Sequence, residues 1–183
     1  MRKSALAVFL LLSIFFLASR MAAAAEGLDR KPDLLVDDDK VQCPAATFTS
    51  IQAAIDAANP GDLIRVCPGT YREQPSIDKS LSIEGDNGAI VLPGNMTVNA
   101  TGSTGTPIAA AILVKEAADV EIEGLIVDTA NSGITQCSPD LIGILYQNSS
   151  GRIERNAVRN TKLSVSLNGC QSGNAIVVQS LGS

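Results

Sequence analysis

The sequence contains no histidine and no tryptophan, and only 3% of its 183 residues are aromatic. Because imidazole is the commonest protein ligand for zinc and copper, the missing histidine argues against such sites. No Cys-x-x-Cys pair compensates for it. Aromatic faces also cover the apolar side of sugar rings, and beyond Ala25 only Phe48, Tyr71 and Tyr146 are aromatic. A sugar-binding groove would therefore depend on asparagine, aspartate and arginine.

Positive charge is also scarce. The chain has 14 lysines and arginines against 19 acidic residues, a net charge of −5. Three of the basic residues (Arg2, Lys3 and Arg20) and none of the acids lie in residues 1–25, so the remainder has 11 basic and 19 acidic residues, or −8. Such a chain is a poor nucleic-acid binder and repels anionic polysaccharide unless cations bridge the two. We expect no nucleic-acid partner.

The N-terminus has the organisation of a secretion signal. Arg2 and Lys3 precede an uncharged apolar run from Ala5 to Ala18, and Ala23–Ala25 supply small residues for cleavage before Glu26. The run is too short for a comfortable membrane span, although an uncleaved signal anchor is the alternative. We predict that residues 1–25 are a signal peptide, that the protein is secreted or extracytoplasmic (periplasm or cell surface), and that it has no membrane association after cleavage.

A 32-residue repeat indicates the fold. Three similar segments occur at this spacing: Ala111–Val114, Gly143–Tyr146 and Ala175–Val178. The first two copies continue into a second strand pattern, Val120–Glu123 and Arg152–Arg155, whereas the third stops in mid-unit. A period of this length with short strands predicts stacked coils. We expect one all-β solenoid domain over residues 26–183, with coils over about 62–180 and truncation at the C-terminal side.

One helix is predicted before the coils, over about residues 49–58. Thr49 and Gln52 match a capping box, and breakers follow from Asn59 to Gly61. The apolar residues fall on one face: Ile51, Ala54, Ile55 and Ala58. We expect this helix to cap the open end of the first coil.

The four cysteines, an even number in an exported chain, predict two disulfides. Three pairings are possible. Cys137 and Cys170 are separated by almost one repeat, which places them at nearly equivalent positions of adjacent coils, and Cys43 and Cys67 flank the helix. We therefore predict the pairs Cys43–Cys67 and Cys137–Cys170.

Two further sets of residues are candidate sites. Asp37, Asp38 and Asp39 are three adjacent carboxylates that could contribute to a Ca²⁺ site; the alternative, which we favour, is a solvated strand end. No other cofactor is expected. Asn95, Asn99 and Asn148 each begin an Asn-x-Ser/Thr triplet and are candidate glycosylation sites if the source is eukaryotic. The first two fall in residues 94–107, which are rich in glycine, threonine and asparagine and are predicted to be a surface loop.

Several segments together resemble the N-terminal portion of right-handed parallel β-helix proteins of the pectin-lyase-like superfamily. They are Thr49–Ala58, Gly61–Val66, Gly69–Glu73 and Leu81–Gly85. The 32-residue units resemble the coil repeats of the same group, so the resemblance spans roughly Leu34 to Ser180. It implies a right-handed solenoid, and it says little about activity because this fold hosts lyases, hydrolases, esterases and non-enzymatic scaffolds.

Gly69-x-Tyr71-x-Glu73 is similar to the first signature of pectin methylesterases. The family's later blocks, a Gln-Asp segment, an Asp-containing Phe-Ile-Phe-Gly strand and a Gly-Arg-Pro-Trp segment, are missing. The catalytic aspartates and substrate arginine of that family therefore have no counterpart here. We predict that Gly69–Glu73 forms a turn that closes the first coil, and that Arg152, Arg155 and Arg159 are solvated charges and not lyase bases.

Three functions stay open. The favoured hypothesis is an exported β-helix scaffold or binding module, glycan-associated, with no complete catalytic site; its partner would be polysaccharide or cell-surface glycan. The alternative is the N-terminal fragment of a pectin-lyase-fold lyase, esterase or hydrolase whose active site lies on further coils. The third is a small all-β domain that associates end to end through its last coil.

Overall fold

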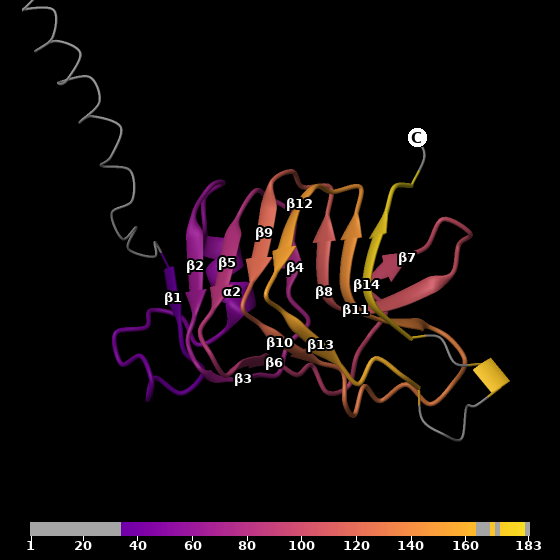
Figure 1. Ribbon diagram of the computed structural model, residues 1–183, viewed down its shortest axis with the longest axis horizontal. Coiled ribbons are helices and arrows are strands. Elements are labelled where there is room, and N and C mark those ends of the chain that lie inside the picture. The colour runs from indigo at the N-terminus through magenta and orange to yellow at the C-terminus, as the bar shows by residue number, and fades with distance from the viewer. Residues whose placement is uncertain (1–33, 164–168, 171–172, 182–183) are drawn as a thin grey trace, which may run out of the picture. The chain divides into compact units, whose positions relative to one another are not determined.

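The computed structural model describes residues 34–163, 169–170 and 173–181, so the predicted signal peptide lies outside the described residues. The described strands form three parallel sheets around one core (Figure 1). Sheet A contains β1 (Leu34–Val36), β2 (Leu63–Val66), β5 (Ser82–Gly85), β9 (Val120–Glu123) and β12 (Gly151–Glu154). Sheet B contains β3 (Gly69–Tyr71), β6 (Ala89–Val91), β10 (Ile126–Asp128) and β13 (Ala157–Arg159). Sheet C contains β4 (Ser76–Ile77), β8 (Pro107–Lys115), β11 (Asp140–Gln147) and β14 (Gly173–Gln179).

Each coil adds one strand to every sheet, in the order A, B, C; β9, β10 and β11 make one such coil. The result is a right-handed parallel β-helix, the predicted fold, with the handedness usual for parallel crossovers. In sheet C, Ile112, Ile144 and Ile176 stand in register, which confirms the predicted period.

Sheet A departs from this period by one residue. Ile122 pairs with Ile153, one position short of a full repeat. The strand predicted at Arg152–Arg155 is β12, which begins one residue earlier, at Gly151. The turn after β11 is one residue shorter than the turn after β8. A length change in a turn thus shifts the following strand without disturbing sheet C.

Apolar side chains from all three sheets meet inside the coils. The largest fully buried ones include Ile64, Tyr71, Ile77, Ile112, Ile122, Leu141 and Ile144. Tyr146 is 2% exposed and donates its hydroxyl to the Val120 carbonyl at 3.0 Å, so its predicted core position is confirmed. One continuous core of this kind holds stacked coils together.

A second apolar cluster lies on the outer face of sheet C. It consists of Ala100, Ile108, Ala110, Leu113, Ile142 and Leu145. Residues 97–106, here named the strap, fold over this face and contribute β7 (Ala100–Thr101), which pairs antiparallel with the start of β8. The predicted surface loop over residues 94–107 lies at the surface, with most of the strap exposed, but it also contains β7 and covers the apolar outer face of sheet C. The hairpin stands out at the right of Figure 1.

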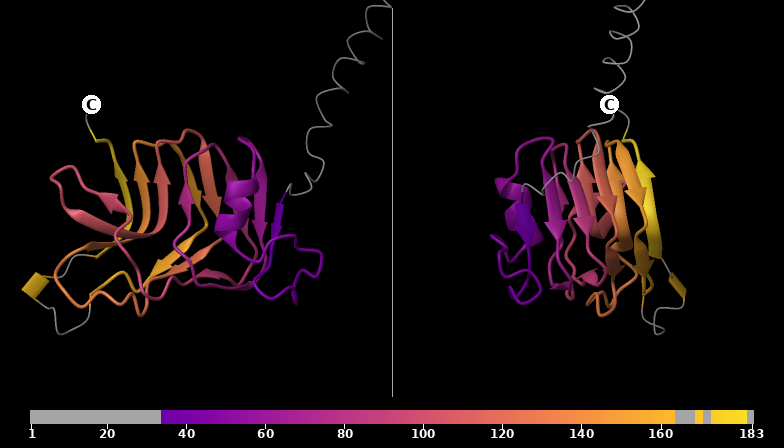
Figure 2. Two further views of the ribbon diagram at one scale, coloured as in Figure 1. Left: turned by 180° about the vertical axis from the view of Figure 1, so that it is seen from behind. Right: turned by 60° about the vertical axis from the view of Figure 1, so that its left-hand side comes forward.

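Helix α2 (Ile51–Ala57) lies beside β1 and β2 (Figure 2). Its Ile51, Ala54 and Ile55 are buried in the core. The predicted capping box at Thr49 and Gln52 is wrong. Ser50 is the N-cap, and its hydroxyl accepts a hydrogen bond from the Ala53 N–H.

Side chains from the next coil cap α2 at both ends. Glu73 accepts the N–H groups of Ile51 and Gln52 at 2.7 and 2.9 Å, and Lys79 donates to the carbonyls of Ile55 and Ala58. A carboxylate at the N-terminus and an ammonium at the C-terminus both complement the helix dipole. This explains why the local box is not needed.

The N-terminal edge of each sheet is closed. The edge of β1 pairs with the backbone at Phe48, and the Thr70 N–H of β3 donates to the Asp38 carboxylate. The Gln52 amide exchanges two hydrogen bonds with the backbone of Ser76 in β4. The predicted capping role of the N-terminal region is therefore distributed over the helix and the loop before it, which protects edges that would otherwise pair with other chains.

Both predicted disulfides are present. Cys43–Cys67 joins the loop before α2 to the end of β2, with Cα atoms 6.3 Å apart. Cys137–Cys170 joins adjacent coils, with Cα atoms 5.4 Å apart. No helix among the described residues is both long and apolar enough to cross a membrane.

Candidate functional site

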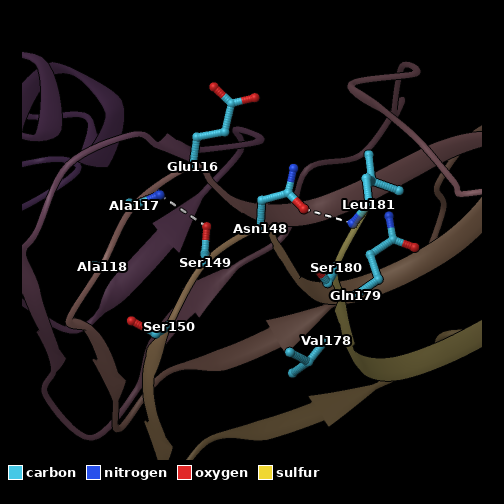
Figure 3. A pocket seen from close by; sticks show the side chains of 10 residues that line it. All are labelled: Glu116, Ala117, Ala118, Asn148, Ser149, Ser150, Val178, Gln179, Ser180 and Leu181. Atoms are coloured by element: carbon cyan, nitrogen blue, oxygen red, sulfur yellow. Dashed lines mark hydrogen bonds between the residues drawn. The ribbon is translucent and has the colours of Figure 1, made fainter. Parts of the chain in front are cut away.

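A groove runs over the turns that lead from sheet C toward sheet A. Residues 116–118, 148–150 and 178–181 line it, and we name it the turn groove (Figure 3). Its volume is about 800 Å³. The three segments belong to successive coils, so the groove follows the axis of the β-helix.

The strand register places polar residues one above another beside the groove. Lys115, Gln147 and Gln179 pair across β8, β11 and β14. The next residues continue the ladder, because the Glu116 N–H donates to the Gln147 carbonyl and the Asn148 N–H to the Gln179 carbonyl. Strands in a sheet are about 4.8 Å apart, so equivalent side chains repeat at about that distance.

The polar groups of the turn groove suit binding more than acid–base or nucleophilic chemistry. Of the ten described residues that line it, Glu116 alone is charged. The Ser149 hydroxyl donates to the Gln147 carbonyl and accepts the Ala117 N–H. The Ser150 hydroxyl accepts the Asp119 N–H. Both serines are thus bonded to backbone groups and not to a general base, which an activated nucleophile requires.

One donor in the turn groove is unsatisfied. The side-chain nitrogen of Gln179 is buried and has no hydrogen-bond partner among the described residues. Buried polar groups are nearly always hydrogen-bonded, so a small shift of this amide toward an acceptor in the groove would be favourable. Figure 3 shows Gln179 next to Leu181, whose N–H donates to the Asn148 amide oxygen at 2.7 Å.

A second hollow adjoins the turn groove beneath the strap. It shares Glu116 and Leu181 with the groove and has a volume of about 430 Å³. Thr101 of the strap and Lys115 of β8 also line it. The strap is fixed at this point because Gln147 donates its amide to the Thr101 carbonyl at 2.8 Å. The two hollows together extend the polar surface from the strap to β14.

The predicted calcium residues lie away from the turn groove, in the loop before α2. Oxygens of Asp37, Asp38 and Asp39 approach within 4.8 Å of one another. Each carboxylate accepts a backbone N–H, from Cys43, Thr70 and Val41 respectively. The three aspartates therefore stabilise the backbone of this loop and satisfy an N–H group at the edge of β3. Calcium binding there stays a prediction.

The three candidate glycosylation sites differ in their surroundings. Asn99 is half-buried, and its amide exchanges two 2.9 Å hydrogen bonds with the backbone of Ala110. Asn148 is exposed but lines the turn groove, and its oxygen accepts the Leu181 N–H. Asn95 is exposed. A glycan on Asn99 would disrupt its hydrogen bonds to Ala110, whereas a glycan on Asn95 or Asn148 would leave them intact. Glycosylation itself stays a prediction.

The segment that resembles the pectin methylesterase signature has a structural role. Gly69–Tyr71 is strand β3 and not the predicted turn. One edge of β3 pairs with β6, and on the other edge the Thr70 N–H donates to the Asp38 carboxylate. Tyr71 is buried, its hydroxyl donates to the Cys67 carbonyl at 2.8 Å, and burial, with the nearby carboxylates of Asp38 and Asp37, raises its pKa. Glu73 caps α2.

The three arginines of the last coil are exposed, as predicted, but each is also paired with an acid of the preceding coil. Arg152 contacts Glu121 at 2.8 Å, and Arg155 contacts Glu123. Arg159 contacts Asp128 at 2.7 Å. They do not converge on a common centre and belong to the outer faces of sheets A and B.

We compared the chain with known proteins. No family model matches it, and no curated protein matches it. Among solved structures, it is similar to a pectin methylesterase mutant crystallised in complex with a hexasaccharide, with 15% sequence identity and a TM-score of 0.57. The match covers 73% of this chain and 45% of the methylesterase chain, so this chain spans less than half of it. At this identity the likeness shows the parallel β-helix fold alone.

Sequence reasoning missed the turn groove, although a signal for it was present. The repeat aligns Lys115, Gln147 and Gln179 when it is followed one residue beyond the apolar strand cores. Without the structure, nothing indicated that these positions border a hollow. The same is true of Glu73, whose partners lie more than twenty positions away in sequence.

Proposed function

We propose that the chain is an exported parallel β-helix module that binds polysaccharide through the turn groove and has no complete catalytic site of its own. Polar residues at the same position of three successive turns line the groove and carry this proposal: Glu116, Asn148 and Ser180. Amide, hydroxyl and carboxylate groups are the partners that sugar hydroxyls use. A glycan that lies along the axis would meet at least one polar side chain at each turn.

Binding is tested with the secreted chain in affinity gel electrophoresis, with plant and microbial polysaccharides cast in the gel. We expect retarded migration in at least one gel. Gln179→Ala should reduce the retardation, because it removes a polar group that lines the groove. Thr135→Ala is the matched control, since Thr135 is exposed and lines a separate hollow. Equal retardation of both variants would show that the turn groove is not the binding site.

A second candidate function is part of a pectin-lyase-fold enzyme. It is supported by the similarity to a pectin methylesterase. The match covers 45% of that chain, which suits a chain that is one part of a longer enzyme. Methanol release and loss of viscosity on pectin distinguish the two candidates. Turnover of either kind by the purified chain would establish an enzyme and overturn the proposed binding module.

Export is proposed from the signal-like N-terminus and the two disulfides, which form and persist in oxidising compartments. The full chain expressed in a secreting host should appear outside the cytoplasm with Glu26 as its first residue. N-terminal sequencing checks this. A cell-retained product that begins at Met1 would contradict it.

A further inference from the structure

We infer that the turn groove selects uncharged glycans over polyuronates. This inference rests on the proposed function and specifies its ligand. Glu116 lines the groove and is exposed, and no hydrogen bond or ion pair of its carboxylate is found among the described residues, so no described partner neutralises its charge. Lys115 in the adjoining hollow is the one cation near it among the described lining residues.

Charge decides between the two classes of sugar. A polyuronate brings one carboxylate per ring, whereas the lining residues offer one cation and one anion. The chain beyond Ala25 also carries a net charge of −8, from 11 basic and 19 acidic residues. Both the local and the overall field therefore oppose a polyanion. A neutral glycan meets no such penalty, and its hydroxyls can donate to Glu116 and accept from amides.

The polar groups match a neutral chain in chemistry and in spacing. Asn148 is exposed and provides an NH₂ group that can donate, and Ser150 and Ser180 provide hydroxyls. The Gln179 amide would have to turn outward to reach a ligand, because its nitrogen is buried without a described partner. The groove spans three stacked turns about 4.8 Å apart, a spacing close to the length of one pyranose unit in an extended chain. We expect about three sugar units to be bound, one per turn.

The test is a titration of residues 26–183 with four hexasaccharides: cellohexaose, xylohexaose, β-1,4-galactohexaose and hexagalacturonate. Isothermal titration calorimetry gives affinities, and the side-chain NH₂ signals of Asn148 and Gln179 in a ¹⁵N correlation spectrum locate the site. We expect at least one neutral sugar to bind and to shift these signals. Hexagalacturonate should bind about tenfold more weakly or worse, since several like charges enter the groove.

Glu116→Gln isolates the charge. The side chain keeps its shape, and it has no described partner to lose, so the fold should be unaffected. Affinity for hexagalacturonate should rise about threefold, the effect of removing one like charge at a solvent-exposed site, and high salt should abolish the rise. Affinity for the neutral sugar should stay equal or fall. Glu84→Gln, an exposed carboxylate of sheet A, is the control.

The outcomes separate the two proposals. Tighter binding of hexagalacturonate than of every neutral sugar, or neutral binding without shifts at Asn148 and Gln179, would overturn the selectivity and leave polysaccharide binding in place. No binding of any of the four sugars, together with unretarded migration in every polysaccharide gel, would overturn both.

Discussion

Glu73 shows how a single side chain can fix a helix from a different coil. Its carboxylate accepts hydrogen bonds from the N–H groups of Ile51 and Gln52 and from the Ser50 hydroxyl, so it satisfies donors that the first turn of any helix leaves free. It also connects the loop after β3 to α2. The first coil and its helix should therefore be stabilised together.

Glu73→Gln tests this role. The amide can accept fewer hydrogen bonds and directs its NH₂ group toward the donors of the helix, so we expect a loss of about 1–3 kcal/mol in the free energy of unfolding. Urea denaturation followed by circular dichroism measures it. The exposed Glu84→Gln should change stability by less than about 0.5 kcal/mol. A loss of the same size in both variants would contradict the capping role.

The surroundings of Asp128 predict that the stability of the fold depends on pH. Burial alone would raise its pKa, but hydrogen bonds from Asn160 and the Ala130 N–H, with the Arg159 ion pair, hold the pKa below its usual value. A lowered pKa in the folded state means that ionised Asp128 stabilises the fold at all pH values above its unfolded pKa of about 3.9. This contribution is lost as the pH falls through the lower, folded pKa.

Asp128→Asn should therefore unfold at lower urea concentration than wild type at pH 7, with a loss of about 1–3 kcal/mol. The difference should shrink in denaturation series taken below about pH 4, because the unfolded wild type is protonated first and the folded carboxylate follows at its lower pKa. The exposed Asp78→Asn is the control. A difference that stays constant down to about pH 2.5 would show that ionisation of Asp128 is not its source.

Among the elements, the turns between sheets A and B depend on close backbone contact. Gly124 has φ +72°, and a Cβ placed on it would overlap the carbonyl oxygen of Gly85 in the coil below. Only glycine allows the two turns to stack this tightly. The turn therefore sets the spacing of neighbouring coils at one corner.

Gly124→Ala should lower the free energy of unfolding by about 2–4 kcal/mol, the sum of left-handed strain and steric overlap. Gly94→Ala is matched in backbone angle, with φ +70°, but its Cβ would meet no atom within 4 Å. It should cost only about 1–2 kcal/mol. Thermal and urea unfolding of both variants measure the difference. Equal costs would show that overlap with Gly85 does not matter.

The elements also show what a sequence can and cannot predict. The register of sheet C follows from the repeat, because its strands are long and their apolar pattern recurs. Strands β10 and β13 have three residues each and no alternating pattern of useful length, so they were missed. The strap and the capping roles of Glu73 and Lys79 were missed because each depends on contacts between distant positions. Local sequence patterns do not indicate contacts between positions far apart in the chain.

Over the described residues as a whole, the first and the last described coils differ. The edges of β1, β3 and β4 are closed by Phe48, Asp38 and Gln52. On the last coil, Ile176 and Val178 continue the inward rows of Ile144 and Tyr146 but are 46% and 69% exposed. Apolar side chains and a strand edge at the same place favour association.

Association of residues 26–183 should therefore join two last coils, because the opposite end offers no free edge among the described strands. We expect a reversible monomer–dimer equilibrium in sedimentation velocity over a concentration series. Ile176→Asp, at a position that does not line the turn groove, places a charge in each half of this contact and should weaken dimerisation at least about tenfold, since burying one isoleucine contributes about 1.5–3 kcal/mol. Val41→Asp, 67% exposed in the loop before α2, is the matched control and should leave the equilibrium unchanged. A wild-type chain that stays monomeric at every concentration, or equal effects of both variants, would contradict association through this face.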